Sequence, residues 1–179
     1  GDWRCENGQW VSTGSVVTTE PITIPPALVV VKGNLTLTGT VTFSGLTSSI
    51  TVEGGCAYIN GALQVQLTPA ELEAIARESG SSRSVVLLSQ SSNCTSTLSS
   101  LAVTPVKVAK SCRKASATSS DSNDGTRTSL VVVFKVDSSS CNSRWIILGC
   151  VLGGVLILAV SLILLVTFND KARNLIRPF

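Results

Sequence analysis

Residues 145–168, WIILGCVLGGVLILAVSLILLVTF, form an apolar run without a single charged side chain. At a rise of about 1.5 Å per residue, a helix of about 24 residues covers a bilayer core of about 30 Å. A helix inside a globular domain is rarely so long and apolar on every side. The run therefore predicts one transmembrane helix.

Cations flank this run unevenly. Lys171, Arg173 and Arg177 follow it, and Arg144 alone precedes it closely. Because cytoplasmic flanks carry the excess of Lys and Arg, the sequence predicts an outside N-terminus and a cytoplasmic tail, residues 169–179. This is the type I topology of a protein in the plasma membrane or another cell-surface membrane. The three cations of the tail are expected to contact anionic lipid headgroups.

Two further features agree with an outside N-terminal part. The chain begins at Gly1 and contains no methionine, which indicates a removed signal peptide, with a cut from a larger precursor as the alternative. Two N-x-[ST] sequons, at Asn34 and Asn93, lie on the predicted outer side and are expected to carry glycan. The second sequon has Cys94 at its middle position.

The cysteines on the predicted outer side are disulfide candidates. They are Cys5, Cys56, Cys94, Cys112 and Cys141. An odd number leaves one cysteine over or pairs it with another chain. One hypothesis is an interchain bond at Cys141, close to the membrane. The other is a Cys112–Cys141 bridge with Cys5 or Cys94 free.

Short β-rich runs separated by glycine fill residues 27–67. In order they are ALVVVKG, NLTLTG, TVTFSG, SSITVEGG, CAYING and ALQVQL. Apolar and polar side chains alternate in them, as in half-buried strands. This quasi-repeat predicts a mainly β ectodomain, residues 1–140, of the β-solenoid or β-helix type. A β-sandwich is the alternative, although only Asn7-Gly8 and Asn60-Gly61 supply hairpin-type turns.

One helix, residues 68–79, is expected between the strands. Thr68 is placed as N-cap, Pro69 stands at the first helical position, and Glu71 completes a capping box. Gly80 follows as the expected C-cap. A short amphipathic helix at this place is predicted to close one end of the solenoid.

The segment after the helix predicts a hairpin and then a tether. LAVTPVKVAKS and TSLVVVFKVD are expected to pair across the polar loop SATSSDSNDGTRT, with Asp124-Gly125 at its tip. Residues 131–134 are apolar on both faces, which predicts a central or covered strand. Residues 141–144 then form a short juxtamembrane tether.

The residue types in the sequence indicate that the chain is not an enzyme. The chain contains no histidine, the commonest general base and metal ligand. The run SDSNDG, with Asp121, Asn123 and Asp124, lacks the later Glu of an EF-hand and is interpreted as a turn. We expect no enzyme activity, no cofactor and no metal. Scattered cations give no case for nucleic-acid binding.

The apolar run also holds a small-residue step. Gly149 and Gly153 lie four residues apart, the spacing that lets two membrane helices approach closely. They are therefore predicted helix-packing residues.

The order WRCENGQW, ITIPPALVVVKGNLTLTGTVTFSG, an LTPAEL helix and KVDSSSCN before a Gly-rich apolar run resembles the membrane-proximal end of single-pass surface proteins of protists. The resemblance covers nearly the whole chain. It implies a β-solenoid ectodomain with an attachment or scaffold role, and it brings no catalytic residues. A typical relative would be longer on the N-terminal side.

These observations predict a non-catalytic surface glycoprotein that anchors or assembles an extracellular partner at the membrane. Its protein partner, a second copy or another chain, is expected to add a strand to an edge formed by Val29, Val30, Val31, Leu35 and Leu37. An accessory single-helix subunit of a larger membrane complex is the alternative. In that case Gly149 and Gly153 would contact other membrane helices.

Overall fold

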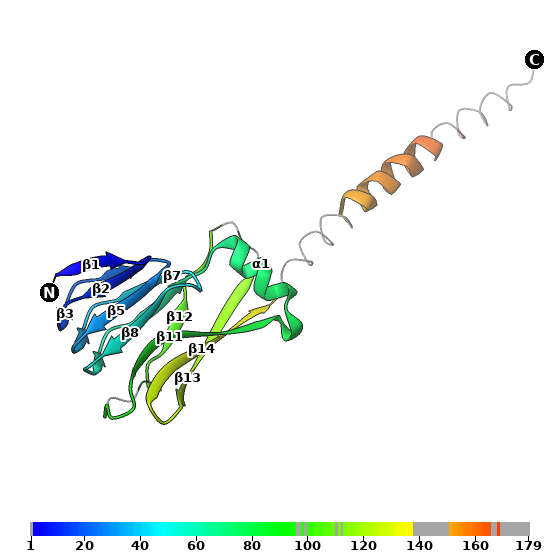
Figure 1. The fold of residues 1–179 in the computed structure, drawn as a ribbon. Coiled ribbons are helices and arrows are strands. Elements are labelled where there is room, and N and C mark those ends of the chain that lie inside the picture. The colour runs from blue at the N-terminus through cyan, green and yellow to red at the C-terminus, as the bar shows by residue number, and fades with distance from the viewer. Residues whose placement is uncertain are drawn as a thin grey trace, which may run out of the picture. The chain divides into compact units, whose positions relative to one another are not determined.

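The computed structural model describes residues 2–95, 98, 100–109, 111, 113–137, 151–165 and 168. The chain divides into two compact units, Gly1–Ser138 and Ser139–Phe179. The first unit is a β-domain that carries one α-helix, and the second contains a helical segment (Figure 1).

The β-domain begins with a series of short strands. They are β1 (Trp3–Glu6), β2 (Gln9–Ser12), β3 (Val16–Thr18), β4 (Ile22–Ile24), β5 (Leu28–Lys32), β6 (Leu35–Leu37), β7 (Val41–Ser44), β8 (Ser49–Glu53), β9 (Ala57–Ile59) and β10 (Leu63–Gln66). The remaining elements are α1 (Pro69–Arg77), the 3₁₀ turn η1 (Ser79–Ser81), β11 (Ser82–Ser91), β12 (Val103–Pro105), β13 (Lys114–Asn123) and β14 (Arg127–Asp137).

Three turns of chain each place one strand in each of three sheets. The first coil consists of β2, β3 and β4, the second of β5, β6 and β7, and the third of β8, β9 and β10. The sheets have the strand orders β1-β2-β5-β8-β11-β14-β13, β3-β6-β9 and β12-β10-β7-β4. Strands of successive coils pair in parallel. The prediction of a mainly β domain is confirmed. Parallel pairing between coils is consistent with a β-helix-like fold, whereas a sandwich of hairpins would pair these strands antiparallel.

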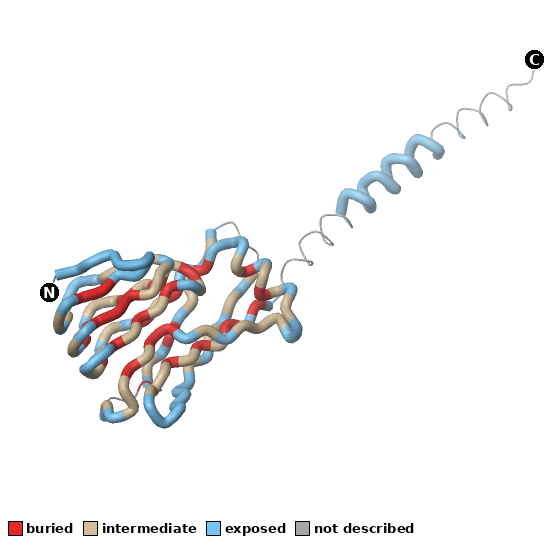
Figure 2. Tube along the Cα trace, viewed as in Figure 1, coloured by how far each residue is buried: buried red, intermediate tan, exposed pale blue. Residues whose placement is uncertain are grey.

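In the second and third coils, alternate side chains of each strand enter a shared core. Leu37 and Val41 are fully buried, and Phe43 and Leu63 are 1% exposed. The polar residues between them face outward, so the buried positions form rows that run from coil to coil (Figure 2). Period-two alternation thus places one face of every sheet in a single hydrophobic core.

Glycines allow the coils to stack closely at their corners. A Cβ atom at Gly55 would lie 2.6 Å from Asn34 N and would collide with the Gly33 carbonyl group of the preceding coil. Gly14 occupies the equivalent corner of the first coil, and a Cβ atom there would meet nothing within 4 Å. The corner glycines are therefore needed where one coil rests on another.

The C-terminal half of the domain departs from the predicted hairpin. Lys114–Asn123, most of which we expected to be loop, is strand β13 and pairs antiparallel with β14. Residues 103–105 pair instead in parallel with β10. Asp124-Gly125 is the hairpin tip, as predicted, with Gly125 at φ 92° and Asp124 N donating to Arg127 O. β14 lies between β11 and β13, which confirms a central strand.

Helix α1 has the predicted N-terminus and a different end. Thr68 and Glu71 form the capping box, with Glu71 N donating to Thr68 Oγ1 and Thr68 N donating to Glu71 Oε2. The helix ends at Arg77 with Glu78 as C-cap, so Gly80 is not the cap; it lies in η1 at φ 78°.

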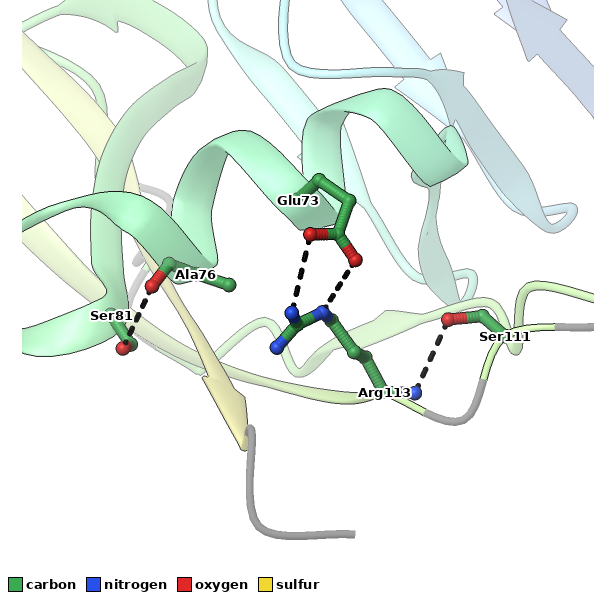
Figure 3. A network of polar contacts seen from close by, with 5 residues as sticks. All are labelled: Glu73, Ala76, Ser81, Ser111 and Arg113. Atoms are coloured by element: carbon green, nitrogen blue, oxygen red, sulfur yellow. Dashed lines mark hydrogen bonds and ion pairs between the residues drawn. The ribbon is translucent and has the colours of Figure 1, made fainter. Parts of the chain in front are cut away.

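The helix is held from both sides. Leu72 and Ile75 are buried in the core. On the outer side, Arg113 Nε and Nη2 bind the Glu73 carboxylate at 2.6 and 3.2 Å, as Figure 3 shows. This ion pair connects α1 to the residue that precedes β13.

In the second unit, residues 151–165 are helical. Among the residues that the structure describes, no helix is long and apolar enough to cross a membrane. Residues 145–150, 166 and 167 of the predicted span lie outside the described residues. The same holds for Gly149 and for Lys171, Arg173 and Arg177. Gly153 lies within the helix, and a Cβ atom there would meet nothing within 4 Å.

Candidate interaction site

The predicted partner edge is wrong. β5 lies between β2 and β8, and β6 lies between β3 and β9, so both strands already have a neighbour on each side. The five residues of that edge are at most 6% exposed: Val29, Val30, Val31, Leu35 and Leu37. The alternating pattern of a sequence predicts that a run is a strand, but it does not predict which strands lie beside it. In the structure, β5 and β6 belong to the second of the stacked coils and therefore have neighbours on both sides.

The edges of the described sheets lie elsewhere. β1 and β13 end the largest sheet, β3 and β9 the smallest, and β4 and β12 the third. The edge strands β1, β3 and β4 all lie at the start of the solenoid, and we call this region the first-coil end. It is the side toward which Gly14 has open space.

The first-coil end is extended by a tight hairpin. β1 pairs antiparallel with β2, with Cys5 opposite Trp10 and Trp3 opposite Ser12. Asn7 and Gly8 connect the strands at φ 51° and 77°. Two central residues with positive φ define a type I′ turn, the turn that Asn-Gly favours. The Asn-Gly signal in the sequence therefore marks a hairpin here.

The hydrogen-bond pattern of this hairpin shows which peptide groups of β1 have no partner in β2. Thr13 N donates to Asp2 O at 3.0 Å, so these two residues form a hydrogen-bonded pair. Such pairs alternate with non-hydrogen-bonded pairs along an antiparallel ladder. The peptide groups of Trp3 and Cys5 therefore point away from β2, toward the free side of β1.

Two indole rings lie on the inner face of this hairpin. Trp10 is in register with Val29, whose side chain belongs to the core. Trp3 and Cys5 share that face, because residues opposite each other and two apart lie on the same side of a sheet. Trp3 is 44% exposed and Trp10 43%. Every residue from Asp2 to Trp10 is exposed (Figure 2), so large apolar surface meets water here.

The three cysteines that the structure describes divide into a bonded pair and a free thiol. Cys56 and Cys94 form a disulfide across a sequence separation of 38. Cys5 is exposed and free. The option of a free Cys94 is therefore wrong, and Cys112 and Cys141 lie outside the described residues.

Both sequons lie at one corner of the solenoid. Asn34 is exposed, and its Oδ1 accepts a hydrogen bond from Cys56 N at 2.9 Å. Cys56 is bonded to Cys94, and the exposed Asn93 precedes Cys94 directly. We call Asn34, Cys56, Asn93 and Cys94 the sequon corner. No spacing in the sequence indicated that these residues meet.

One cavity of the β-domain has few reactive side chains. It measures about 560 Å³ and lies beside the start of α1, between Pro26, Gln66, Pro69 and Val106. Among the described residues that line it, the ionisable ones are Glu71 and Lys107. The Glu71 carboxylate is already bound by Thr68 N and Leu46 N, each at 2.8 Å. The carboxylate therefore serves the fold of this corner.

The interpretation of SDSNDG as a turn holds only for Asp124 and Gly125, because residues 120–123 belong to strand β13. The Asp124 carboxylate accepts hydrogen bonds from Arg127 N at 2.7 Å and from Thr126 N at 2.9 Å. These backbone bonds, together with the Thr126 hydroxyl, lower the pKa of Asp124. Within the described residues, no three His, Cys, Asp or Glu side chains come together as a metal site.

No protein-family model, curated protein or solved structure matches the chain. The evidence for its function therefore comes from the first-coil end and from the sequence.

Proposed function

We propose that the chain is a non-catalytic, type I single-pass surface glycoprotein that assembles an extracellular protein partner at the membrane. The observation that carries this proposal is the pair of half-exposed indoles, Trp3 and Trp10, beside the open edge of β1, which has a strand neighbour only in β2. Aromatic side chains on an open strand suit strand addition, in which the backbone supplies the hydrogen bonds and the rings supply apolar contact.

The membrane part of the proposal depends on the sequence. Residues 145–168 are long and apolar enough to serve as the anchor. The cations at Lys171, Arg173 and Arg177 favour a cytoplasmic tail that contacts lipid headgroups. The Cys56–Cys94 disulfide is consistent with a secreted or surface protein, since such bonds persist in oxidising compartments. Glycan at Asn34 and Asn93 belongs to the same proposal.

A second candidate is an accessory subunit whose helix packs among other membrane helices. It is favoured by one observation: space is open around Gly153, four residues after Gly149 in the sequence. Close helix approach at such a step uses the missing side chains of both glycines.

The test is gentle detergent extraction of the full chain from its native membrane, with sizing and mass spectrometry of co-eluting protein. Under the first proposal, Trp3→Ala with Trp10→Ala lowers the amount of retained extracellular partner at least tenfold, as expected for aromatic hot spots. Tyr58→Ala is the matched control, because Tyr58 is 49% exposed on β9 and belongs to the third coil.

The two candidates give opposite results with Gly153→Leu. The second proposal would replace the first if polytopic membrane proteins co-elute with the chain. In that case Gly153→Leu should release them, and the double tryptophan variant should retain them. Retention that depends on the tryptophans and not on Gly153 supports the first.

A further inference from the structure

Among the edges of the described sheets, β1 is the one best suited to receive another strand. β13 is longer, with ten residues against four in β1, but it carries no aromatic side chain, and Ser119 Oγ donates to Leu101 O beside it at 2.7 Å. The other edge strands, β3, β4, β9 and β12, are three residues each. β1 also carries charges, Arg4 and Glu6, but it presents open peptide groups beside two exposed indoles, which offer apolar contact to an added strand.

We propose that β1 pairs antiparallel with β1 of a second copy of this chain, about a twofold axis at Cys5. This inference rests on the proposed function and names the partner of the same site. A twofold interface brings the same patch of both copies together, so the strand must be complementary to itself.

The backbone of β1 permits few twofold registers. A centre on a hydrogen-bonded pair requires a residue whose peptide groups point outward, which within the strand is Trp3 or Cys5. A centre at Arg4 also keeps the ladder, because it pairs Trp3 of one copy with Cys5 of the other. With Cys5 at the centre, its N–H and C=O bond those of the partner's Cys5.

The charges and the thiol together favour the register centred on Cys5. It places Arg4 opposite Glu6 of the second copy and Glu6 opposite Arg4, which gives two opposite-charge pairs on the outer face. A centre at Trp3 also forms two opposite-charge pairs, with Arg4 opposite Asp2 of the second copy, but it leaves Glu6 beyond the paired residues and separates the two Cys5 thiols. A centre between residues, or at Arg4 or Glu6, either breaks the peptide pattern or sets like charges opposite each other.

The indoles fit the space that this pairing creates. Between β2 of one copy and β2 of the other lie three strand spacings of about 4.8 Å, so the first coils end roughly 14 Å apart. Trp3 and Trp10 of both copies lie on the inner face of the shared sheet, between the two coil ends. Four indole rings then fill this space and leave water.

The two Cys5 thiols can lock the dimer. Residues of a hydrogen-bonded antiparallel pair have Cα atoms about 5.5 Å apart, within the range that a disulfide spans. The bond forms by exchange with a disulfide of the secretory compartment: two Cys5 thiols lose two protons and two electrons, and that disulfide becomes two thiols. Cys5 is exposed and free for this reaction.

The experiment uses the full chain carrying two different tags, co-expressed and captured through one of them. We expect the second tag in the captured fraction. Trypsin cuts after Arg4 and Lys32, so non-reduced digests should contain the peptide of residues 5–32 linked to itself through Cys5. Cys5→Ser should abolish this linked peptide.

Charge reversal tests the register without the disulfide. In the Cys5→Ser chain, Arg4→Glu alone and Glu6→Arg alone should each raise the dimer dissociation constant about tenfold, because attraction becomes repulsion at both symmetric pairs. Combining both reversals should restore the original constant. Circular dichroism of each variant shows whether the β-domain is still folded.

Three other outcomes overturn the inference. A dimer that is insensitive to both single reversals uses another surface. A monomer that retains a different extracellular protein through Trp3 and Trp10 leaves the proposed function standing and removes the second copy as partner. A monomer with fully alkylatable Cys5 and no retained protein removes both proposals.

Discussion

At the scale of the residue, Gly55 decides whether the third coil can rest on the second. A Cβ atom there would collide with the Gly33 carbonyl group. We expect Gly55→Ala to lower the free energy of unfolding by about 1–3 kcal/mol, the usual cost of forcing backbone apart in a packed structure. Thermal unfolding of the full chain in detergent, followed by circular dichroism in the β region, measures the change.

Gly14→Ala is the matched control for this prediction. It adds the same methyl group at the same corner, but in the first coil, where nothing lies within 4 Å. Its stability should stay the same or rise by a few tenths of a kcal/mol, since alanine restricts the unfolded chain. Equal losses in both variants would show that coil contact is not the cause.

The sequence predicted the positions of the glycine corners but not the contacts between corners of neighbouring coils. The rhythm of Gly33, Gly39, Gly55 and Gly61 between alternating strands was sufficient to place turns. It could not show that a residue in one coil touches the residue about twenty positions earlier, because that depends on the length of each coil. The meeting of Asn34 with Cys56 was missed for the same reason.

At the scale of the element, α1 is attached to the domain by a pH-dependent contact. The hydrogen bond from Arg113 to Glu73 lowers the pKa of Glu73 below its usual value. The ionised carboxylate therefore favours the folded chain at pH values above the ordinary glutamate pKa of about 4.3. This contribution is lost as the pH falls through the lower pKa of the folded state.

We expect Glu73→Gln to flatten the acid side of the stability profile. The unfolding temperature of the variant should approach that of the natural chain as the pH falls from about 7 to about 3. The difference at neutral pH should be small, because exposed ion pairs contribute little. Glu53→Gln, which removes an exposed carboxylate from β8, controls for the loss of charge. A constant difference between the natural chain and Glu73→Gln at all pH values would contradict the proposed titration.

Strand β13 was not predicted from the sequence, for a reason that its composition shows. The run KASATSSDSN contains no large apolar residue, and Ser, Asp and Asn normally favour turns. It forms a strand because the apolar β14 offers a complete hydrogen-bond ladder on its free side. Tertiary pairing thus outweighs local preference. The capping box of α1 was predictable because all its contacts lie within one helical turn.

At the scale of the molecule, the β-domain has two regions with different surface chemistry. The sequon corner holds both asparagines that are expected to carry glycan. The first-coil end holds the exposed tryptophans, the free thiol and the open strand β1. Glycan is bulky and solvated, so it would keep proteins from the sequon corner and leave the first-coil end to make contacts.

Two substitutions separate the glycan at Asn34 from the fold. Asn34→Gln and Thr36→Val both destroy the sequon, so we expect each to remove one glycan from the mass of the chain isolated from its native membrane. Only Asn34→Gln also disturbs the hydrogen bond from Cys56 N to Asn34 Oδ1, at a cost of about 1 kcal/mol.

After enzymatic deglycosylation, the unfolding temperature of Asn34→Gln should therefore lie below that of Thr36→Val, whose valine suits the strand β6. Both variants should still display the first-coil end and retain its partner, because Asn34 belongs to the second coil and the tryptophans belong to the β1–β2 hairpin. Unchanged mass in both variants would show that Asn34 is not modified. Partner loss in Thr36→Val would show that the glycan itself contributes to assembly, and the separation between the two regions would then have to be abandoned.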